Sequence, residues 1–339
     1  MRLAFSATET KRAVERTRRR MVVIRTAFEK RHGNAPIPRV DDDELDRYLA
    51  QKNGSEVRYR WRDAKNGGIE KTLMLLAGWT CHPCMYTPVI PRLNENHRLI
   101  TLENRGHWKS TLGRSNDGTY ISDIATDANA ALEAHRVEKV VLVGHSMGGL
   151  VSLNFTRRFP EKVAGIVMVC APYTNPLKTW AFDSGSIVEN ALKIISYGIE
   201  LSGPALDTVK RKLFADSLLI QELARAAVEE IGGAEVNGSF DKLFNRFMRT
   251  NSKAFAMAFR AMLRENGDNL DQLVRSDIPI LAITGSRDVI VVSSAWEQII
   301  DRMPNAKLVI LPVGHLPTME APEQTARLIS EFASGCFKK

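Results

Sequence analysis

The stretch "VVLVGHSMGGL", residues 140–150, presents a serine among small residues directly after an apolar run. The run from Lys139 to Val143 predicts a buried strand, and Leu150 to Phe159 predicts a helix. Ser146 therefore falls on a short strand-to-helix turn, in the pattern Gly-x-Ser-x-Gly. Such a turn has a strained backbone and holds the serine hydroxyl out at the tip of the strand. We interpret Ser146 as a candidate nucleophile.

The residues around this serine fit the geometry of the turn. Glycines on both sides leave room for the strand and the helix to approach each other closely. The pattern alone occurs by chance in about one chain in ten of this length, so the predicted strand and helix carry the argument. The turn consists of Gly144, His145, Ser146, Met147 and Gly148.

A serine nucleophile needs a base, and the base needs an acid that orients it. Two later strands are predicted at Ile278 to Thr284 and at Lys307 to Leu311. Asp288 follows the first of them, and His315 follows the second. Because parallel strands present their carboxyl ends at one edge of a sheet, we expect Ser146, Asp288 and His315 to meet there as a catalytic group.

The remainder of the chain alternates strand patterns with helix patterns. This alternation predicts an α/β protein with a mostly parallel central sheet flanked by helices. The further predicted strands are Glu56 to Arg62, Thr72 to Ala77, Leu99 to Glu103 and Val163 to Cys170, and the further predicted helices are Ser122 to His135 and Glu320 to Phe332.

With these motifs, the chain resembles the α/β-hydrolase superfamily, in its serine-hydrolase branch of esterases and lipases. The resemblance covers roughly residues 55–335 and rests on the Ser146 turn, on Gly285 to Asp288, and on Gly314-His315 with the following Pro317 to Pro322. It implies the α/β-hydrolase fold. It also implies the triad order of nucleophile, acid and base that these residues follow.

The segment from Glu103 to Ser110 resembles the family loop Asp-x-Arg-Gly-x-Gly-x-Ser with two departures. Glu103 stands where the family has Asp, and Trp108 stands where it has Gly. We expect both departures to reshape the rim of the pocket and to leave the triad untouched.

The family resemblance also locates an oxyanion hole, the pair of N–H groups that holds the negative oxygen of the reaction intermediate. It implies the backbone N–H groups of Trp79 and Met147. The first follows the turn Ala77-Gly78, where the family has a His-Gly turn. The missing histidine tends to brace that turn, so another group must brace it here.

The segment Cys81-His82-Pro83-Cys84 has the form of a thioredoxin-type redox site. No second redox domain follows it, and Thr80 separates Trp79 from Cys81, so we set this function aside. Two interpretations remain open. A helix N-terminus could lower the pKa of one thiol and allow a disulfide switch on activity, or both thiols could serve as small apolar groups. Three ligands without a fourth do not predict a metal site.

Residues 173–277 exceed what the fold needs, and we expect them to form an inserted helical cap. The predicted core then comprises residues 55–172 and 278–339, and residues 1–54 form a basic helical extension with a linker. Large apolar side chains in the cap would form its own core, and some would line a lipophilic acyl pocket. They are Trp180, Phe182, Ile187, Leu192, Ile194, Ile195, Tyr197, Ile199, Phe214, Leu218, Phe244, Phe247, Met248, Phe255, Met257, Phe259 and Met262.

The net charge of +8 belongs to the N-terminal segment. Residues 1–39 hold 11 basic and three acidic side chains, whereas the other 300 residues hold 36 of each. A neutral body gives no reason to expect nucleic-acid binding. Residues 10–32 have helical periodicity, which fits a docked helix, a contact with an anionic membrane surface, or a targeting peptide. With no spanning segment and few cysteines, we expect a cytoplasmic protein, in contact with a membrane surface if that second interpretation holds.

These observations predict a hydrolase that cleaves a carboxylic ester with a lipophilic acyl group through an acyl-enzyme, without cofactor or metal. Other chemistries on the same triad stay open: hydrolysis of carbon–carbon bonds, thioester cleavage, acyl transfer and cofactor-free perhydrolysis. A non-catalytic ligand receptor of this fold also stays open. Beyond a small-molecule ester substrate, the sequence predicts neither a partner nor an oligomeric state.

Overall fold

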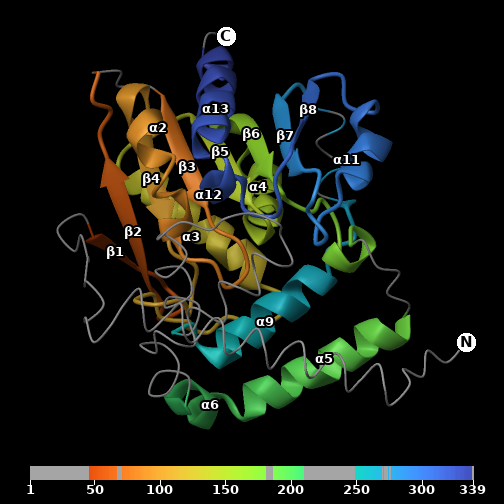
Figure 1. The fold of residues 1–339 in the computed structure, drawn as a ribbon. Helices are drawn as coiled ribbons and strands as arrows, with labels where there is room; N and C mark the ends of the chain where they lie inside the picture. The colour runs from red at the N-terminus through yellow and green to blue at the C-terminus, as the bar shows by residue number, and fades with distance from the viewer. Residues whose placement is uncertain are drawn as a thin grey trace, which may run out of the picture.

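The computed structural model describes residues 46–66, 71–180, 186–209 and 249–337, apart from 269, 271–273 and 275. Its centre is an eight-stranded sheet with the strand order β1-β2-β4-β3-β5-β6-β7-β8 (Figure 1). The strands are β1 (Asp46–Ala50), β2 (Glu56–Arg62), β3 (Thr72–Leu76), β4 (Arg98–Leu102), β5 (Val140–His145), β6 (Val163–Val169), β7 (Ile280–Gly285) and β8 (Ala306–Leu311).

The strands from β3 to β8 run parallel to one another, and only β1 and β2 join the sheet antiparallel. The mostly parallel sheet predicted from the sequence is therefore confirmed. Its middle strands are mostly apolar because both faces are covered, as parallel sheets require. In β3, for example, every residue is buried.

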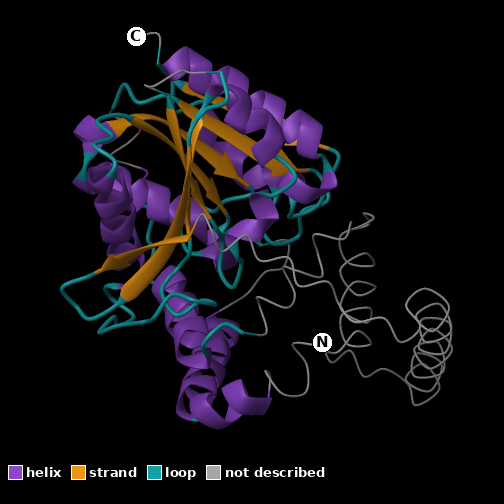
Figure 2. Ribbon diagram, turned by 90° about the vertical axis from the view of Figure 1, so that its left-hand side faces the viewer, coloured by secondary structure: helices purple, strands orange, loops and turns teal. Residues whose placement is uncertain are grey.

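Helices cover both faces of the sheet (Figures 1 and 2). Along β3, Met74 and Leu76 belong to one core cluster, and Leu73 and Leu75 belong to the other. Side chains of α3 (Tyr120–Ala134), α4 (Met147–Arg158) and α11 (Ser293–Ile300) join the first cluster. Side chains of α2 (Ile90–Asn96), α12 (Pro317–Glu320) and α13 (Pro322–Cys336) join the second. Short 3-10 helices connect several elements: η2 (Pro83–Tyr86), η3 (Pro160–Lys162) and η4 (Pro176–Lys178).

Strand β1 is a difference from the sequence prediction. We expected residues before 55 to form an extension and linker, but residues 46–50 pair with β2 and extend the sheet. The cause is tertiary: the acidic Asp46 binds Arg58 and Arg60 of β2, at 2.7 Å each. The predicted basic helix at residues 10–32 and the linker up to residue 45 lie outside the described residues.

Between β6 and β7 the described residues form the helices α5 (Ser186–Leu201), α6 (Gly203–Val209) and α9 (Ser252–Leu263), beside η4. These three helices lie at one end of the sheet in both views (Figures 1 and 2). Met257, Phe259 and Met262 of α9 are buried, as expected for the interior of a cap. Ile194 and Ile195 of α5 are exposed, so for them the predicted core position is wrong.

Tyr197 of α5 is exposed as well. Of the other apolar cap residues, Phe182, Ile187, Phe214, Leu218, Phe244, Phe247 and Met248 lie where the side chains are not described. The division into core and cap stays a prediction. Among the described helices, none combines the length and the apolar character needed to cross a membrane.

Candidate active site

Ser146 occupies the single residue between β5 and α4, and its backbone lies in the left-handed region with φ 51°. A non-glycine residue pays a strain cost there of about 1–3 kcal/mol. Its N–H donates to the Val169 carbonyl at 3.0 Å, which fixes the turn to the end of β6. The side chain is half-buried. The sharp turn predicted from the sequence is present.

The two glycines of the turn have a clear physical reason. A Cβ on Gly144 would overlap the backbone of Gly148, and a Cβ on Gly148 would overlap the Leu76 carbonyl of β3. Any side chain at either position would push α4 away from the strands. The close approach of helix and strand therefore depends on glycine at both positions, as the motif predicts.

Asp288 and His315 meet at the same edge of the sheet. His315 Nδ1 lies 2.8 Å from Asp288 Oδ2, and the Asp288 side chain is inaccessible to solvent. The other oxygen, Oδ1, accepts the N–H groups of Ile290 and Val291, at 2.8 and 3.0 Å. Burial alone would raise the pKa of Asp288, but the charge and hydrogen bond of His315 and these two N–H groups hold that pKa below its usual value. Asp288 is therefore a carboxylate placed to accept the Nδ1 proton of His315, which directs Nε2 away from it.

His145 connects the Ser146 turn to His315. Its Nε2 donates to the His315 carbonyl at 2.8 Å, and the two rings lie 4.9 Å apart between centroids. Burial, together with the neighbouring His315, lowers the pKa of His145 to about 3, so the ring is neutral near pH 7. The sequence identified His145 only as a member of the turn. Its contact with His315 spans 170 positions of the chain, and no local pattern signals it.

A second brace on His315 was not predicted. Glu320 accepts the N–H of Gly314 at 2.7 Å and the N–H of Leu316 at 2.9 Å, one with each carboxylate oxygen. These two bonds hold the residues on either side of His315. The sequence offered one signal for this contact: Glu320 is the first residue of the helical pattern that follows His315.

Among the described residues, no hydrogen bond joins the Ser146 hydroxyl to His315. Catalytic hydrogen bonds are often long in proteins without substrate and shorten in the reacting complex. The contact through His145, the neighbour of Ser146, places the serine turn next to the histidine. The three predicted residues thus share one edge, with acid and base already joined.

The turn after β3 lies against the serine turn. A Cβ on Gly78 would come within 2.9 Å of both His145 Nδ1 and Ser146 Cβ. Trp79 follows Gly78, and Met147 follows Ser146. In the described part of the chain, neither the Trp79 N–H nor the Met147 N–H has a backbone acceptor. Two N–H groups without acceptors beside a strained serine are compatible with the predicted oxyanion hole.

The family histidine that would brace this turn is absent, and other residues brace the turn here. Tyr86 donates its hydroxyl to the Leu76 carbonyl at 2.9 Å, and Asn104 donates its amide to the carbonyls of Ala77 and Gly78. The Trp79 indole donates to the Phe255 carbonyl of α9 at 2.9 Å. Tyr86 lies ten residues after Leu76, whereas Asn104 and Phe255 are distant in sequence.

The two departures in the Glu103 loop have different surroundings. Glu103 is fully buried, so the expectation that it shapes the pocket rim is wrong for this residue. Trp108 is half-buried in a left-handed backbone, with the Arg249 guanidinium 5.0 Å from its ring centre. Arg249 lies just before α9, so Trp108 contacts the region over the sheet edge.

The Cys81–Cys84 segment carries no disulfide, because both sulfurs are free thiols. Burial raises the pKa of the Cys81 thiol to about 12, and Cys81 precedes η2 rather than beginning it. The predicted lowering of a thiol pKa is therefore wrong for Cys81. The thiol stays protonated near neutral pH, which fits the interpretation as a small packing group.

Within the described residues, one group of three possible metal ligands has its atoms within 4.8 Å of one another: Cys170, Asp288 and His315. Burial raises the pKa of the Cys170 thiol far above its usual value, so the sulfur is a poor ligand. Asp288 and His315 are already joined to each other. The arrangement fits an acid–base pair beside a neutral thiol.

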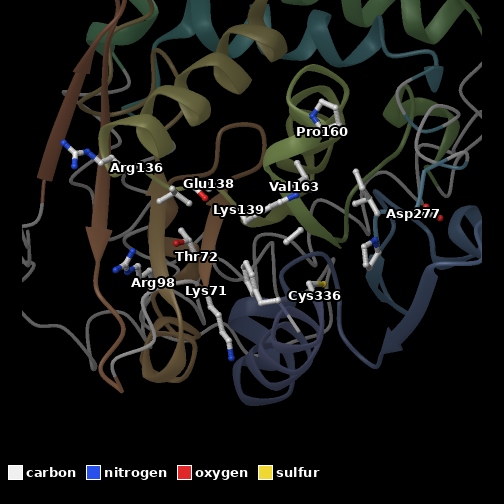
Figure 3. Close-up of a pocket in the computed structure, with 15 residues that line it drawn as sticks. Lys71, Thr72, Arg98, Arg136, Glu138, Lys139, Pro160, Val163, Asp277 and Cys336 are labelled. Carbon is white, nitrogen blue, oxygen red and sulfur yellow. The ribbon is translucent and has the colours of Figure 1, made fainter. Parts of the chain in front are cut away.

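A cavity of about 840 Å³ lies at the opposite end of the parallel strands (Figure 3). Basic side chains Lys71, Arg98, Arg136 and Lys139 line it together with Glu138 and Asp277. It lies at the amino ends of the strands, beside Thr72 of β3 and Val163 of β6. Ser146 and His315 follow the carboxyl ends of their strands, so this cavity belongs to the other edge.

A sequence profile of the alpha/beta hydrolase fold matches residues 71–322. The chain belongs to the α/β-hydrolase family. The matched range includes all three candidate catalytic residues and both candidate oxyanion turns.

Several curated relatives of this α/β hydrolase are esterases. It is 24% identical over 277 residues to a pimeloyl-[acyl-carrier protein] methyl ester esterase from Wigglesworthia glossinidia brevipalpis, covering 80% of this chain and 96% of the relative. An esterase of the same name from Xanthomonas axonopodis pv. citri is 26% identical over 272 residues, covering 79% and 96%.

Solved structures show the same fold. A hydrolase from Pseudomonas aeruginosa PA01 superposes with a TM-score of 0.67 at 21% identity, covering 85% of this chain and 97% of that one. A thermophilic esterase from Thermogutta terrifontis superposes with a TM-score of 0.64 at 20% identity, covering 86% and 98%. These likenesses establish the α/β-hydrolase fold.

Proposed function

We propose that this α/β hydrolase cleaves carboxylic esters, with Ser146 as nucleophile, His315 as general base and Asp288 as the orienting acid. The observation that carries the proposal is the 2.8 Å hydrogen bond between Asp288 and His315, on a loop held against the serine turn by His145. The esterase relatives support the same chemistry.

The reaction proceeds in two halves. His315 Nε2 takes the proton of the Ser146 hydroxyl while its oxygen attacks the ester carbonyl, and His315 then returns that proton to the departing alcohol. Water attacks the resulting acyl-enzyme by the same route and releases the acid. Asp288 keeps Nδ1 protonated and stabilises the imidazolium that forms in each half.

The negative oxygen of each tetrahedral intermediate sits between the N–H groups of Trp79 and Met147. Each such donor contributes on the order of 10²–10³ in rate, because it is fixed before charge develops. Met147 is the first residue of α4, so the positive end of that helix adds to its donor.

A lipophilic acyl group fits the surroundings of this hole. The half-buried Trp79 ring stacks beside Phe255 and Phe259 of α9, at 4.6 and 5.1 Å between centroids. Apolar surface next to the oxyanion turn favours acyl chains that bury methylene groups, at about 0.8 kcal/mol each. Two of the relatives are named as pimeloyl-[acyl-carrier protein] methyl ester esterases, which supports an acyl ester as the substrate class.

The test is the Ser146→Ala variant, assayed with nitrophenyl esters of increasing acyl length. We expect activity to fall by roughly 10⁴-fold while the protein stays folded, and we expect the parent's kcat/KM to rise from two carbons toward six or eight. Ser152→Ala is the matched control, because Ser152 lies in α4, just after the turn, and its hydroxyl donates to the Gly148 carbonyl.

Two results would contradict the proposal. Activity of Ser146→Ala within tenfold of the parent would exclude this serine as the nucleophile. A parent protein that binds esters without turnover would favour a ligand receptor.

A further inference from the structure

The turn that carries the Trp79 N–H lacks the family histidine, yet two neighbouring residues just after β4 hold both of its ends. We propose that Asn104 and Glu103 are positioning residues that fix the Trp79 N–H for the oxyanion. The inference rests on the proposed ester hydrolysis and assigns these two residues their part in it.

Asn104 holds the near end of the turn. Its side-chain amide donates to the Ala77 and Gly78 carbonyls, at 3.2 Å each, and the residue is 1% exposed. The Gly78 carbonyl and the Trp79 N–H belong to one planar peptide group, with oxygen and hydrogen on opposite sides. Fixing the Gly78 oxygen therefore fixes the direction in which the Trp79 N–H points. Asn104 acts through the peptide and does not touch the reacting atoms.

Glu103 holds the far end through His82. His82 Nε2 lies 2.9 Å from Glu103 Oε2, and His82 Nδ1 accepts the Cys84 N–H at 3.0 Å. Because Nδ1 accepts, the ring proton is on Nε2 and points to the carboxylate. Between the two anchors lies Thr80, whose backbone is left-handed with φ 61°. A strained residue persists only where its surroundings hold it.

The Glu103 carboxylate is itself held firmly. Oε1 accepts the N–H groups of Lys109 and Ser110 at 2.7 and 2.8 Å, and Oε2 pairs with Arg58 at 2.6 Å. Burial would raise the pKa of Glu103, but the hydrogen bond from His82, the charge of Arg58 and the Lys109 N–H lower it below the usual value. Glu103 is therefore a fixed anion to which the loop after Trp79 is tied.

These contacts also give a structural role to the segment that resembles a redox motif in the sequence. In Cys81-His82-Pro83-Cys84 the histidine side chain caps η2 and contacts Glu103. Cys81 adds a second tie, since its N–H donates to the Gly78 carbonyl at 3.2 Å. The segment therefore holds the turn on the downstream side of Trp79, as Asn104 does on the upstream side.

The experiment compares Asn104→Ala with Asn94→Ala. Asn94 is a matched control because it is also buried and also donates to two carbonyls, those of Asp63 and His97, beside the start of β4. For Asn104→Ala we expect kcat to fall about 30- to 100-fold with KM within threefold, since a donor misplaced by 1 Å costs on the order of 10² in rate. Asn94→Ala should lose comparable thermal stability and keep kcat.

A second readout separates positioning from general damage. An alkyl trifluoromethyl ketone forms a tetrahedral adduct with an active serine and places an oxyanion in the hole, whereas the matching non-fluorinated ketone does not. The affinity of Asn104→Ala for the fluorinated ketone should fall by the same factor as kcat, and that for the plain ketone should stay within threefold.

The His82→Asn variant tests the Glu103 end and remains informative if Asn104→Ala fails to fold. An asparagine side-chain oxygen can still accept the Cys84 N–H and cap η2, but the shorter side chain loses the bond to Glu103. We expect a kcat loss of about tenfold with KM unchanged.

The inference is overturned if both variants keep kcat within twofold of the parent, or if Asn94→Ala loses kcat as Asn104→Ala does. Either result leaves the proposed function intact provided that Ser146→Ala is inactive. Retained activity in Ser146→Ala would instead remove the proposed function.

Discussion

Two turns meet beside Ser146, and they are built in different ways. The turn after β5 is made by its own residues: a left-handed Ser146 between glycines that let α4 approach the strands. The turn after β3 has Gly78 and the Cys81 N–H as local determinants, and groups from other elements fix the rest, namely Tyr86, Asn104 and the Phe255 carbonyl.

This difference shows which parts of a catalytic site can be recognised from the sequence. A turn made by its own residues leaves a pattern in the sequence, because each position has a local steric requirement. A turn held from outside leaves a much weaker pattern, because most of the atoms that hold it belong to other elements of the fold. Substitutions should therefore act differently on the two turns.

Among substitutions that keep Ser146, the largest effect is expected for Gly148→Ala, which breaks the contact between the turns. The new Cβ would overlap the Leu76 carbonyl, so α4 and β3 must separate. We expect kcat/KM for a nitrophenyl ester to fall roughly 10²–10³-fold and the unfolding free energy to fall by about 3 kcal/mol. Gly335→Ala in α13 is the control, because its Cβ would meet open space and should be neutral or stabilising. Equal behaviour of the two variants would contradict the steric explanation.

An intermediate effect is expected for His145→Gln, measured as stability against pH. The folded pKa of His145 is about 3, below the usual value near 6.5, so only the unfolded chain gains this proton as the pH falls. Stability is therefore fully present above pH 6.5 and is lost on acidification. A glutamine can still donate to the His315 carbonyl but does not titrate. From pH 6.5 to 5 the parent should lose about 2 kcal/mol more than the variant in urea unfolding. Parallel curves would show that His145 does not titrate in this way.

The smallest effect is expected for Trp79→Phe, which tests the outer support of the β3 turn. Phenylalanine keeps an aromatic ring beside Phe255 and Phe259 but loses the hydrogen bond to the Phe255 carbonyl. Losing one neutral hydrogen bond of about 1 kcal/mol should lower kcat about fivefold. Trp61→Phe, which loses an indole bond to Asp63, is the control. A fivefold loss in the control as well would remove the link between this bond and the turn.

The sequence determined the fold class and the three candidate catalytic positions. Alternating strand and helix patterns gave a mostly parallel sheet, and the sheet brings residues after β5, β7 and β8 to one edge. The Gly-x-Ser-x-Gly turn was predictable because its requirement is local: only glycine fits where helix and strand backbones touch. Strand β1 escaped prediction because its five residues carry no clear strand pattern and are held in the sheet by pairing with β2 and by the ion pair between Asp46 and Arg58.

Only the tertiary structure decided how the candidate site is held. Nothing in the local sequence of Asn104 or His145 indicates which carbonyl each one meets, because those partners depend on how the strands are ordered in the sheet. The same holds for Cys81, for which the sequence left a reactive thiol and a small packing group both open. Burial keeps the thiol protonated. Sequence determines conformations that a few neighbouring residues enforce sterically, whereas hydrogen-bond partners and pKa values depend on groups that only folding brings together.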